Sequence, residues 1–282
     1  MATQLSLKKL IMRTGDLPSM PFVATKVMQI VSNANSTVEE LQTTIQDDQA
    51  LASRILKIAN SALYARSRQI TTIADAVVML GFNNIRSLAV ASATKNLYVK
   101  RGKVLGLKDK LLWEHSVAAA VACRLLGQRT RPGIADEAFL WGLLHDIGKL
   151  VILQKVPDAF DKIVELVYND GREFVDVERE LLGFTHAEVG ALIINKWKLS
   201  ERFEQAILHH HEVVPGKSDE WVIYIDVANK ICKKLGFGFV RQEDLDLTQD
   251  TSVQALGLSA EKMDLIVGIA HDTIREEMEF FN

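Results

Sequence analysis

The sequence has few of the residues that cross-link, break or bend a chain. Its 282 residues include two cysteines, five prolines and sixteen glycines, and aromatic residues make up only 7%. The cysteines, Cys123 and Cys232, form no CxxC pair, which argues against a disulfide framework and fits a reducing compartment. We interpret both as buried thiols. With proline and glycine scarce, and with alanine, leucine, glutamate and lysine dominating the long segments, the composition favours a helical protein.

The chain also lacks long apolar runs and a large excess of charge of either sign. No uninterrupted apolar stretch approaches the length that spans a bilayer, and residues 1–10 lack the apolar core and cleavage site of a secretory signal. The net charge of −3 and the isoelectric point near 6.2 provide no basic field for nucleic acid or an anionic membrane. We therefore expect a cytoplasmic protein whose partners are neither nucleic acid nor membrane.

Apolar residues recur at helical spacing through most of the chain, and we find no convincing alternating strand. The pattern predicts an all-α fold that forms a two-lobed helical bundle. A short amphipathic helix is expected over residues 5–13, and Ser36 with Glu39 predicts a capping box. Gly81 is expected to end a helix. Further helices are predicted near residues 159–169, 173–183, 186–197, 201–210, 219–235 and 259–281.

Two segments interrupt this pattern. Residues 100–108 combine charge with two glycines, and we place a boundary there between an amino-terminal lobe of residues 1–103 and a second lobe of residues 104–282. Residues 237–250 are rich in glycine and acidic residues, and we interpret them as a surface loop.

Histidine is absent from the first 114 residues, yet six of the seven histidines fall between His115 and His211. His145 and Asp146 stand side by side within the apolar stretch Phe139–Leu153, which would bury both on a helix. Burying an unpaired carboxylate is costly, so a buried cation or a metal ion must compensate Asp146. Several histidines together with a carboxylate are the donors that a borderline divalent metal requires.

The first lobe contains five distinctive motifs. They are Leu17-Pro18-Ser19-Met20-Pro21, Asp47-Asp48-Gln49-Ala50-Leu51, Leu56-Lys57-Ile58-Ala59-Asn60-Ser61-Ala62-Leu63-Tyr64, Ile73-Ala74-Asp75-Ala76 and Leu80-Gly81. In their order and spacing these motifs resemble the amino-terminal part of the HDOD family, and the resemblance covers essentially the whole chain.

The second lobe resembles the wider HD superfamily of metal-dependent phosphohydrolases. Its histidine series is similar to the metal ligands of HD-GYP cyclic-dinucleotide phosphodiesterases. The resemblance implies the metal ligands His115, His145, Asp146, His186, His210 and His211. It also implies an all-helical bundle with a bacterial signalling role, and many HDOD proteins are thought to have lost the ligands and to act as regulatory modules.

Two departures from the superfamily pattern stand out. Its last aspartate usually follows an alanine, and here that place reads Val227-Ala228-Asn229, so that Asp226 would have to substitute from the same helix. The Gly-Tyr-Pro element expected after the paired histidines is missing.

Each candidate residue also has a structural interpretation. His145 and Asp146 could form a buried ion pair, His186 could cap or pack at a helix start, and His115 is evenly balanced between ligand and core residue. Lys149 lies on the face of His145 and could bind phosphate, although a lysine of this kind usually reaches the surface. Successive helical residues differ by about 100°, so at most two of the residues 209–211 can point inwards, and we expect His209 to be solvated.

Two hypotheses follow. We favour a regulatory, protein-interaction module of a signalling protein that retains an HD-type metal centre. The alternative is a metal-dependent phosphohydrolase acting on a nucleotide or cyclic dinucleotide, with Asp146 and Lys149 as catalytic residues, Asp146 bridging two ions and Lys149 neutralising developing charge. In either case we expect one or two divalent transition-metal ions, iron or manganese before zinc, a signalling protein as partner and a nucleotide or phosphoester as ligand.

Overall fold

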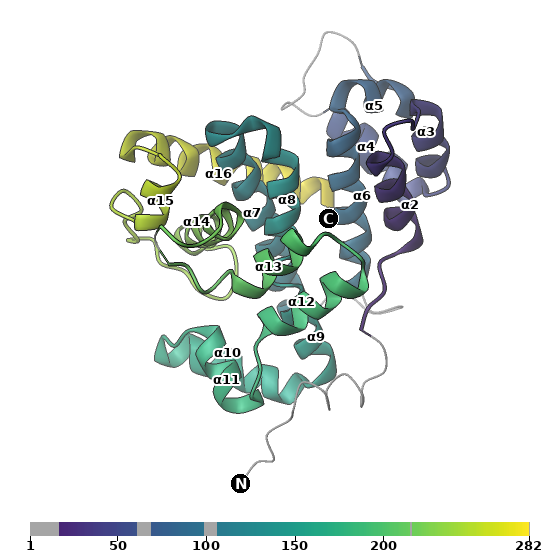
Figure 1. The fold of residues 1–282 in the computed structure, drawn as a ribbon. Helices are drawn as coiled ribbons and strands as arrows, with labels where there is room; N and C mark the ends of the chain where they lie inside the picture. The colour runs from purple at the N-terminus through teal and green to yellow at the C-terminus, as the bar shows by residue number, and fades with distance from the viewer. Residues whose placement is uncertain (1–16, 61–68, 99–105, 215, 282) are drawn as a thin grey trace. The chain divides into compact units, whose positions relative to one another are not determined.

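The computed structural model describes residues 17–60, 69–98, 106–214 and 216–281 (Figure 1). Across these residues the structure is helical and contains no strand, which confirms the predicted all-α fold. The helix expected over residues 5–13 and most of the boundary segment 100–108 lie outside the described residues.

The chain forms two compact units, each described here by itself. One unit draws its described residues from the ranges 20–103 and 275–282, and the other from the ranges 1–19 and 104–274. The division into lobes of residues 1–103 and 104–282 stays a prediction. All residues of the implied ligand series belong to the second of these units.

The first unit is a small helical bundle whose helix ends follow local sequence signals. Thr37 caps α3, because its side chain accepts a hydrogen bond from Glu40 N while the Glu40 side chain accepts one from Thr37 N. The predicted capping box of Ser36 and Glu39 was therefore one residue too early. Gly81, at a φ of 80°, ends α5 as predicted. The helices of this unit are α2 (Phe22–Ser32), α3 (Val38–Gln46), α4 (Gln49–Ala59), α5 (Ile73–Leu80) and α6 (Phe82–Tyr98).

The second unit is built around the long helix α7 (Leu107–Thr130), which packs against α8 (Ala135–Leu144) and α14 (Glu220–Leu235). Its middle is rich in buried alanine, and Cys123 and Cys232 are buried free thiols, as predicted. The other helices of the unit are η2 (Pro132–Ile134), α9 (Ile147–Lys155), α10 (Pro157–Asp170), α11 (Phe174–Leu182), α12 (His186–Lys196), α13 (Glu201–His209), α15 (Thr251–Ala255) and the first part of α16 (Ala260–Phe281).

Two glycines let the helices around residues 145 and 146 approach closely. A Cβ atom on Gly142 would lie 2.3 Å from Ala119 O, where α8 meets α7. A Cβ atom on Gly148 would lie 1.9 Å from His186 O, where α9 meets the start of α12. Both contacts are shorter than any real Cβ contact, so the packing of these helices requires glycine at the two positions.

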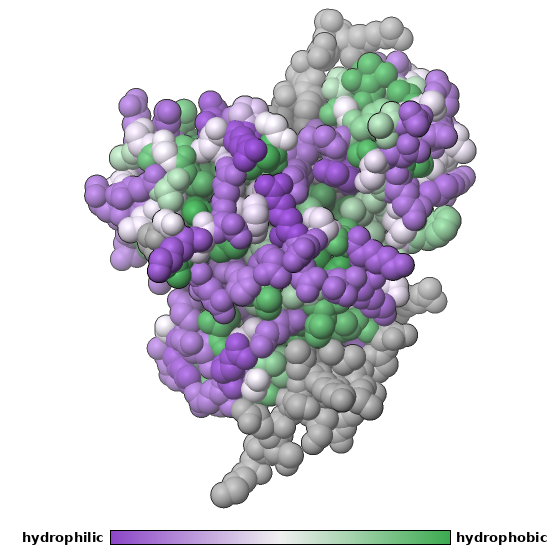
Figure 2. All heavy atoms as spheres, in the orientation of Figure 1, coloured by the Kyte–Doolittle hydropathy of each residue, from purple (hydrophilic) through white to green (hydrophobic). Residues whose placement is uncertain are grey.

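Among the described residues, no single helix is both long and apolar enough to cross a membrane, although α5 and α6, bent by 113° at their junction, meet the test as a pair. On the face drawn in Figure 2, hydrophilic side chains cover most of α12–α14, and apolar atoms gather over α5, where Val78 is 75% exposed.

Candidate metal centre

His145 and Asp146 lie at a break between two helices. His145 is the C-cap of α8 and Asp146 is the N-cap of α9, with Lys149 one turn into that helix. The expectation that one helix carries both residues was wrong. The break turns both side chains into the interior, where His145 is 0% and Asp146 2% exposed. The Asp146 carboxylate is therefore buried in the middle of the apolar segment Phe139–Leu153.

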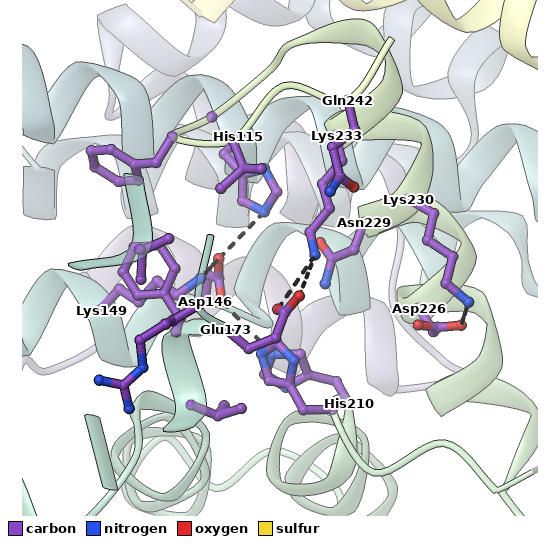
Figure 3. A pocket seen from close by; sticks show the side chains of 18 of the residues that line it. His115, Asp146, Lys149, Glu173, His210, Asp226, Asn229, Lys230, Lys233 and Gln242 are labelled. Atoms are coloured by element: carbon purple, nitrogen blue, oxygen red, sulfur yellow. Dashed lines mark hydrogen bonds and ion pairs between the residues drawn. The ribbon is translucent and has the colours of Figure 1, made fainter. Parts of the chain in front are cut away.

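Imidazoles from three other parts of the unit surround the Asp146 carboxylate. The Nε2 atoms of His115 and His145 each lie 3.3 Å from Asp146 Oδ2. On the other side, the Nε2 atoms of His186 and His210 lie 3.1 and 3.7 Å from Asp146 Oδ1. His211 joins this side, since its Nε2 is 3.0 Å from His186 Nε2. Figure 3 shows His115 and His210 approaching Asp146 from opposite directions.

The other ring nitrogen of four of these histidines is held by a protein acceptor. Nδ1 of His145 donates to Gly142 O, and Nδ1 of His210 donates to Ile207 O, each at 2.7 Å. The loop after α14 supplies Phe237 O, 3.0 Å from Nδ1 of His115. A carbonyl oxygen only accepts hydrogen bonds, so Nδ1 carries the proton in each ring and Nε2 is turned to the carboxylate. This tautomer and orientation are the ones that metal-ligating histidines adopt.

Glu178 holds the fourth ring. Its Oε2 accepts from His186 Nδ1 at 2.7 Å and from His186 N at 2.8 Å, and both side chains are fully buried. The capping box of Thr185 and Glu188 fixes the first turn of α12, which begins at His186. A carboxylate that orients a histidine in this way is a recurrent feature of metal sites.

Residues of the cluster form two groups that could each hold a metal ion. Asp146, His186, His210 and His211 form one group, hereafter the His186 group, and His115, His145 and Asp146 form the other, hereafter the His115 group. Within each group the ligand atoms all lie within 4.8 Å of one another. Asp146 Oδ1 is buried and accepts no hydrogen bond from the described residues. An orphaned carboxylate oxygen faced by imidazole nitrogens is chemically suited to a divalent transition metal.

The electrostatics of the cluster are set by burial and by Asp146. Burial alone would raise the pKa of the Asp146 carboxyl, but nearby His145 and Lys149 hold that pKa well below its usual range. Burial lowers the pKa of His210 to about 3, which keeps this ring neutral. Burial also opposes the charged form of His115, yet contacts with Asp146 and Cys232 raise its pKa to about 10. A metal that binds at His115 Nε2 must therefore displace a proton.

A cavity of about 600 Å³ opens onto the cluster. It is lined by His115, Asp146, Lys149, His210 and His211, by phenylalanines of α11 and of the loop after α14, and by basic and acidic side chains in equal number. Lys149 is only 8% exposed; its Nζ lies 2.8 Å from Asp146 Oδ2 and 4.3 Å from the centre of the Phe174 ring. The surface-reaching alternative for Lys149 was therefore wrong.

The remaining basic residues of the cavity are paired with acids. Lys233 Nζ lies 3.3 Å from Glu173 Oε1, and Lys230 Nζ lies 2.7 Å from Asp226 Oδ2, as the dashed lines in Figure 3 show. Lys230 also pairs with Asp250 at 2.7 Å. Asp226 is therefore engaged in its own ion-pair cluster and lies in neither metal-binding group. His209 faces solvent beside Glu212, as predicted.

Sequence patterns did not identify Glu178 or the loop of residues 237–250 as part of the site. Glu178 lies four residues after Phe174 on the buried face of α11, and an acid on an apolar face was the signal that could have found it. The loop was expected at the surface, but Phe237, Gly238 and Phe239 line the cavity and Leu247 is 3% exposed. A loop has no helical or strand periodicity from which its burial could be predicted.

An all-helical fold, with a His-Asp doublet at a helix break and further histidines brought to it from separate helices, defines a member of the HD-related superfamily. The chain belongs to the HDOD family, because the model of the HDOD domain matches residues 17–213.

Solved structures of similar proteins agree with this assignment. An HDOD domain protein of unknown function from Geobacter sulfurreducens is 28% identical, with a TM-score of 0.78 over 95% of this chain and 93% of its own. A protein from Shewanella amazonensis SB2B, provisionally named a phosphohydrolase, is 27% identical, with a TM-score of 0.75 over 97% and 98% of the two chains. An uncharacterized protein of Treponema pallidum (strain Nichols) is 24% identical over 71% of this chain. The chain spans 39% of the length of that relative.

Proposed function

We propose that this HDOD protein is a metal-dependent phosphohydrolase that hydrolyses a phosphoester, with a nucleotide or cyclic dinucleotide as the class of substrate. The observation that carries the proposal is the convergence of five imidazoles around the buried carboxylate of Asp146, which lines a cavity of about 600 Å³. The sequence alone favoured a regulatory module. The geometry favours the phosphohydrolase, because a purely structural core has no need to keep these rings beside an open cavity.

The ligand groups suit two ions that share Asp146. Its Oδ1 faces the His186 group and its Oδ2 faces the His115 group. When bound, divalent ions supply Lewis acidity towards phosphoryl oxygens and lower the pKa of water. Iron or manganese fits the mixture of nitrogen and oxygen donors, and zinc is acceptable.

Residues of the chain supply the rest of the chemistry. Lys149, whose Nζ lies 2.8 Å from Asp146 Oδ2, would neutralise the charge that develops on the phosphoryl oxygens. Phe174 packs against the Lys149 ammonium and shields it from water. Lys230 and Lys233 are positioned to exchange their carboxylate partners for substrate phosphates.

The provisional phosphohydrolase name of the Shewanella relative supports this proposal, since the two chains match over nearly their full lengths. A second candidate is the regulatory module expected from the sequence, in which the centre binds metal but turns over no substrate. Asn229, which stands where the superfamily usually has aspartate, favours this second candidate. Both candidate functions include a signalling protein as partner, and this expectation rests on membership of the HDOD family alone.

Asp146→Asn tests the proposal, because the change removes the only charged ligand and preserves the shape of the side chain. Purified protein reconstituted with Mn²⁺ or Fe²⁺ is expected to hydrolyse bis(p-nitrophenyl) phosphate or a cyclic dinucleotide. The variant should lose metal, measured by elemental analysis, and more than about 100-fold of its activity, a larger loss than outer partners of metal ligands produce.

Asp158→Asn is the matched control, since Asp158 is exposed on α10 and does not line the cavity. It should retain metal and activity. Metal binding without turnover of any of these esters would select the regulatory module, and a wild-type chain that binds no transition metal would refute both candidates.

A further inference from the structure

Asn229 is a cavity residue whose side chain has an unexplained buried oxygen. It belongs to α14, which packs against α7, the helix of His115. Its Oδ1 is buried and accepts no hydrogen bond from the described residues. Figure 3 shows the amide pointing into the cavity that His115 and Asp146 also line. A buried carbonyl oxygen without a donor costs free energy, and an ion that binds to it would recover that cost.

The two ligand groups differ in the donors they offer. The His186 group has three imidazoles and Asp146 Oδ1, which is four donors with one unshared carboxylate oxygen. The His115 group has two imidazoles and Asp146 Oδ2, and that oxygen already lies 2.8 Å from the Lys149 ammonium. An ion in the His115 group therefore has one protein donor fewer, and its carboxylate oxygen is shared with a fixed positive charge.

The other carboxylates that line the cavity do not supply the donor that the His115 group lacks. Glu173 is paired with Lys233, and Asp226 is paired with Lys230. Asp176 is exposed. Asn229 thus remains as a buried oxygen donor within the cavity, and it is neutral. Amide oxygens do ligate hard and borderline divalent ions, but they contribute no charge to offset the repulsion between two neighbouring cations.

Resting on the proposed metal centre, we infer that its two halves are unequal, with Asn229 Oδ1 as the neutral fourth ligand of the His115 group. The His186 group holds a resident ion. The His115 group holds a weakly bound, exchangeable ion, because a neutral amide stands in place of a charged ligand and Lys149 competes for Asp146 Oδ2.

Mn²⁺ binding to the intact chain tests this inference without any measure of activity. Equilibrium dialysis with elemental analysis should give one tight ion per wild-type chain and a second that binds at least tenfold more weakly. Asn229→Asp should tighten the second ion at least tenfold and leave the first unchanged, because it adds a charged oxygen at the same position. Asn229→Leu should weaken the second ion further, with the first again unchanged.

Electron paramagnetic resonance gives a second readout. Wild-type protein with one equivalent of Mn²⁺ should show an isolated ion, and Asn229→Asp with two equivalents should show two spin-coupled ions. His211→Ala should weaken the first ion, which assigns that ion to the His186 group. Asn169→Asp adds the same charge at an exposed position on α10 and should change neither affinity.

Two equally tight ions in the wild-type chain would overturn the inference, and so would an Asn229→Asp variant whose second ion binds as weakly as before. In both cases the proposed metal centre would stand, since ions still bind. Absence of any bound Mn²⁺ in the wild-type chain would instead refute the proposed centre and this inference together.

Discussion

Four of the five histidines of the cluster depend on an acceptor for the second ring nitrogen. Those acceptors are the carbonyls of Gly142, Ile207 and Phe237 and the carboxylate of Glu178. Three of the four belong to the main chain, so side-chain substitution cannot remove them. Glu178 is the exception, and the orientation of His186 can therefore be tested by mutation.

Glu178→Gln should lower metal affinity by about 10- to 100-fold, the range for outer partners of metal ligands. Gln keeps the size of the side chain but removes the charge that stabilises the proton on His186 Nδ1. Titration calorimetry with Mn²⁺ measures the effect. Glu165→Gln, on the exposed face of α10 beside Lys162, removes the same charge away from the site and should bind Mn²⁺ normally. An unchanged affinity in Glu178→Gln would show that His186 needs no anionic partner.

At the scale of elements, the centre depends on how closely α9 approaches α12. Gly148 has no side chain at the point where a Cβ atom would lie 1.9 Å from His186 O. The contact places the main chain next to two residues of the cluster, Asp146 and His186. Moving α9 away from α12 would therefore displace both Asp146 and His186.

Gly148→Ala should destabilise the protein by about 1–3 kcal/mol, the usual cost of forcing extra volume into a packed interior. It should also weaken Mn²⁺ binding, because the helices that carry Asp146 and His186 must move apart. Chemical denaturation and calorimetry measure the two effects. Gly133→Ala is the matched control, since nothing lies within 4 Å of the Cβ position there. Equal stability of the two variants would mean that the close approach is not required.

The helices themselves were largely predictable, and the break between α8 and α9 was not. Helical spacing located most elements to within a few residues, since amphipathic segments such as Pro157–Asp170 carry a clear apolar stripe. Phe139–Leu153 is apolar on every side, so its pattern carries no signal for a break at His145. The histidines were identified by clustering and family resemblance. Glu178 reaches His186, and Phe174 and the loop after α14 reach the cavity, only through tertiary packing, which sequence spacing does not report.

At the scale of the whole molecule, all the proposed ligands and the cavity belong to one of the two units. The unit of residues 20–103 and 275–282 contributes none of them. Ligand binding stabilises only the structure that forms the site. The two units should therefore respond differently to metal.

Hydrogen exchange in the presence and absence of Mn²⁺ tests this difference. Amides of α9 and α12 should exchange more slowly with the metal bound, because opening these helices would release the ion. Amides of α3 and α4 should exchange at the same rate in both conditions. Equal slowing in both sets would show that the units open together and that the metal stabilises the chain as one body.

The hydrogen bond from His115 Nδ1 to Phe237 O links one ring of the cluster to a loop rather than to a helix. Because the acceptor is a main-chain atom, this hydrogen bond depends on the path of the loop and not on the side chain at position 237. Any molecule that draws this loop outwards would leave the ring free to rotate. The orientation of His115 is thus tied to the backbone path of the loop that follows α14.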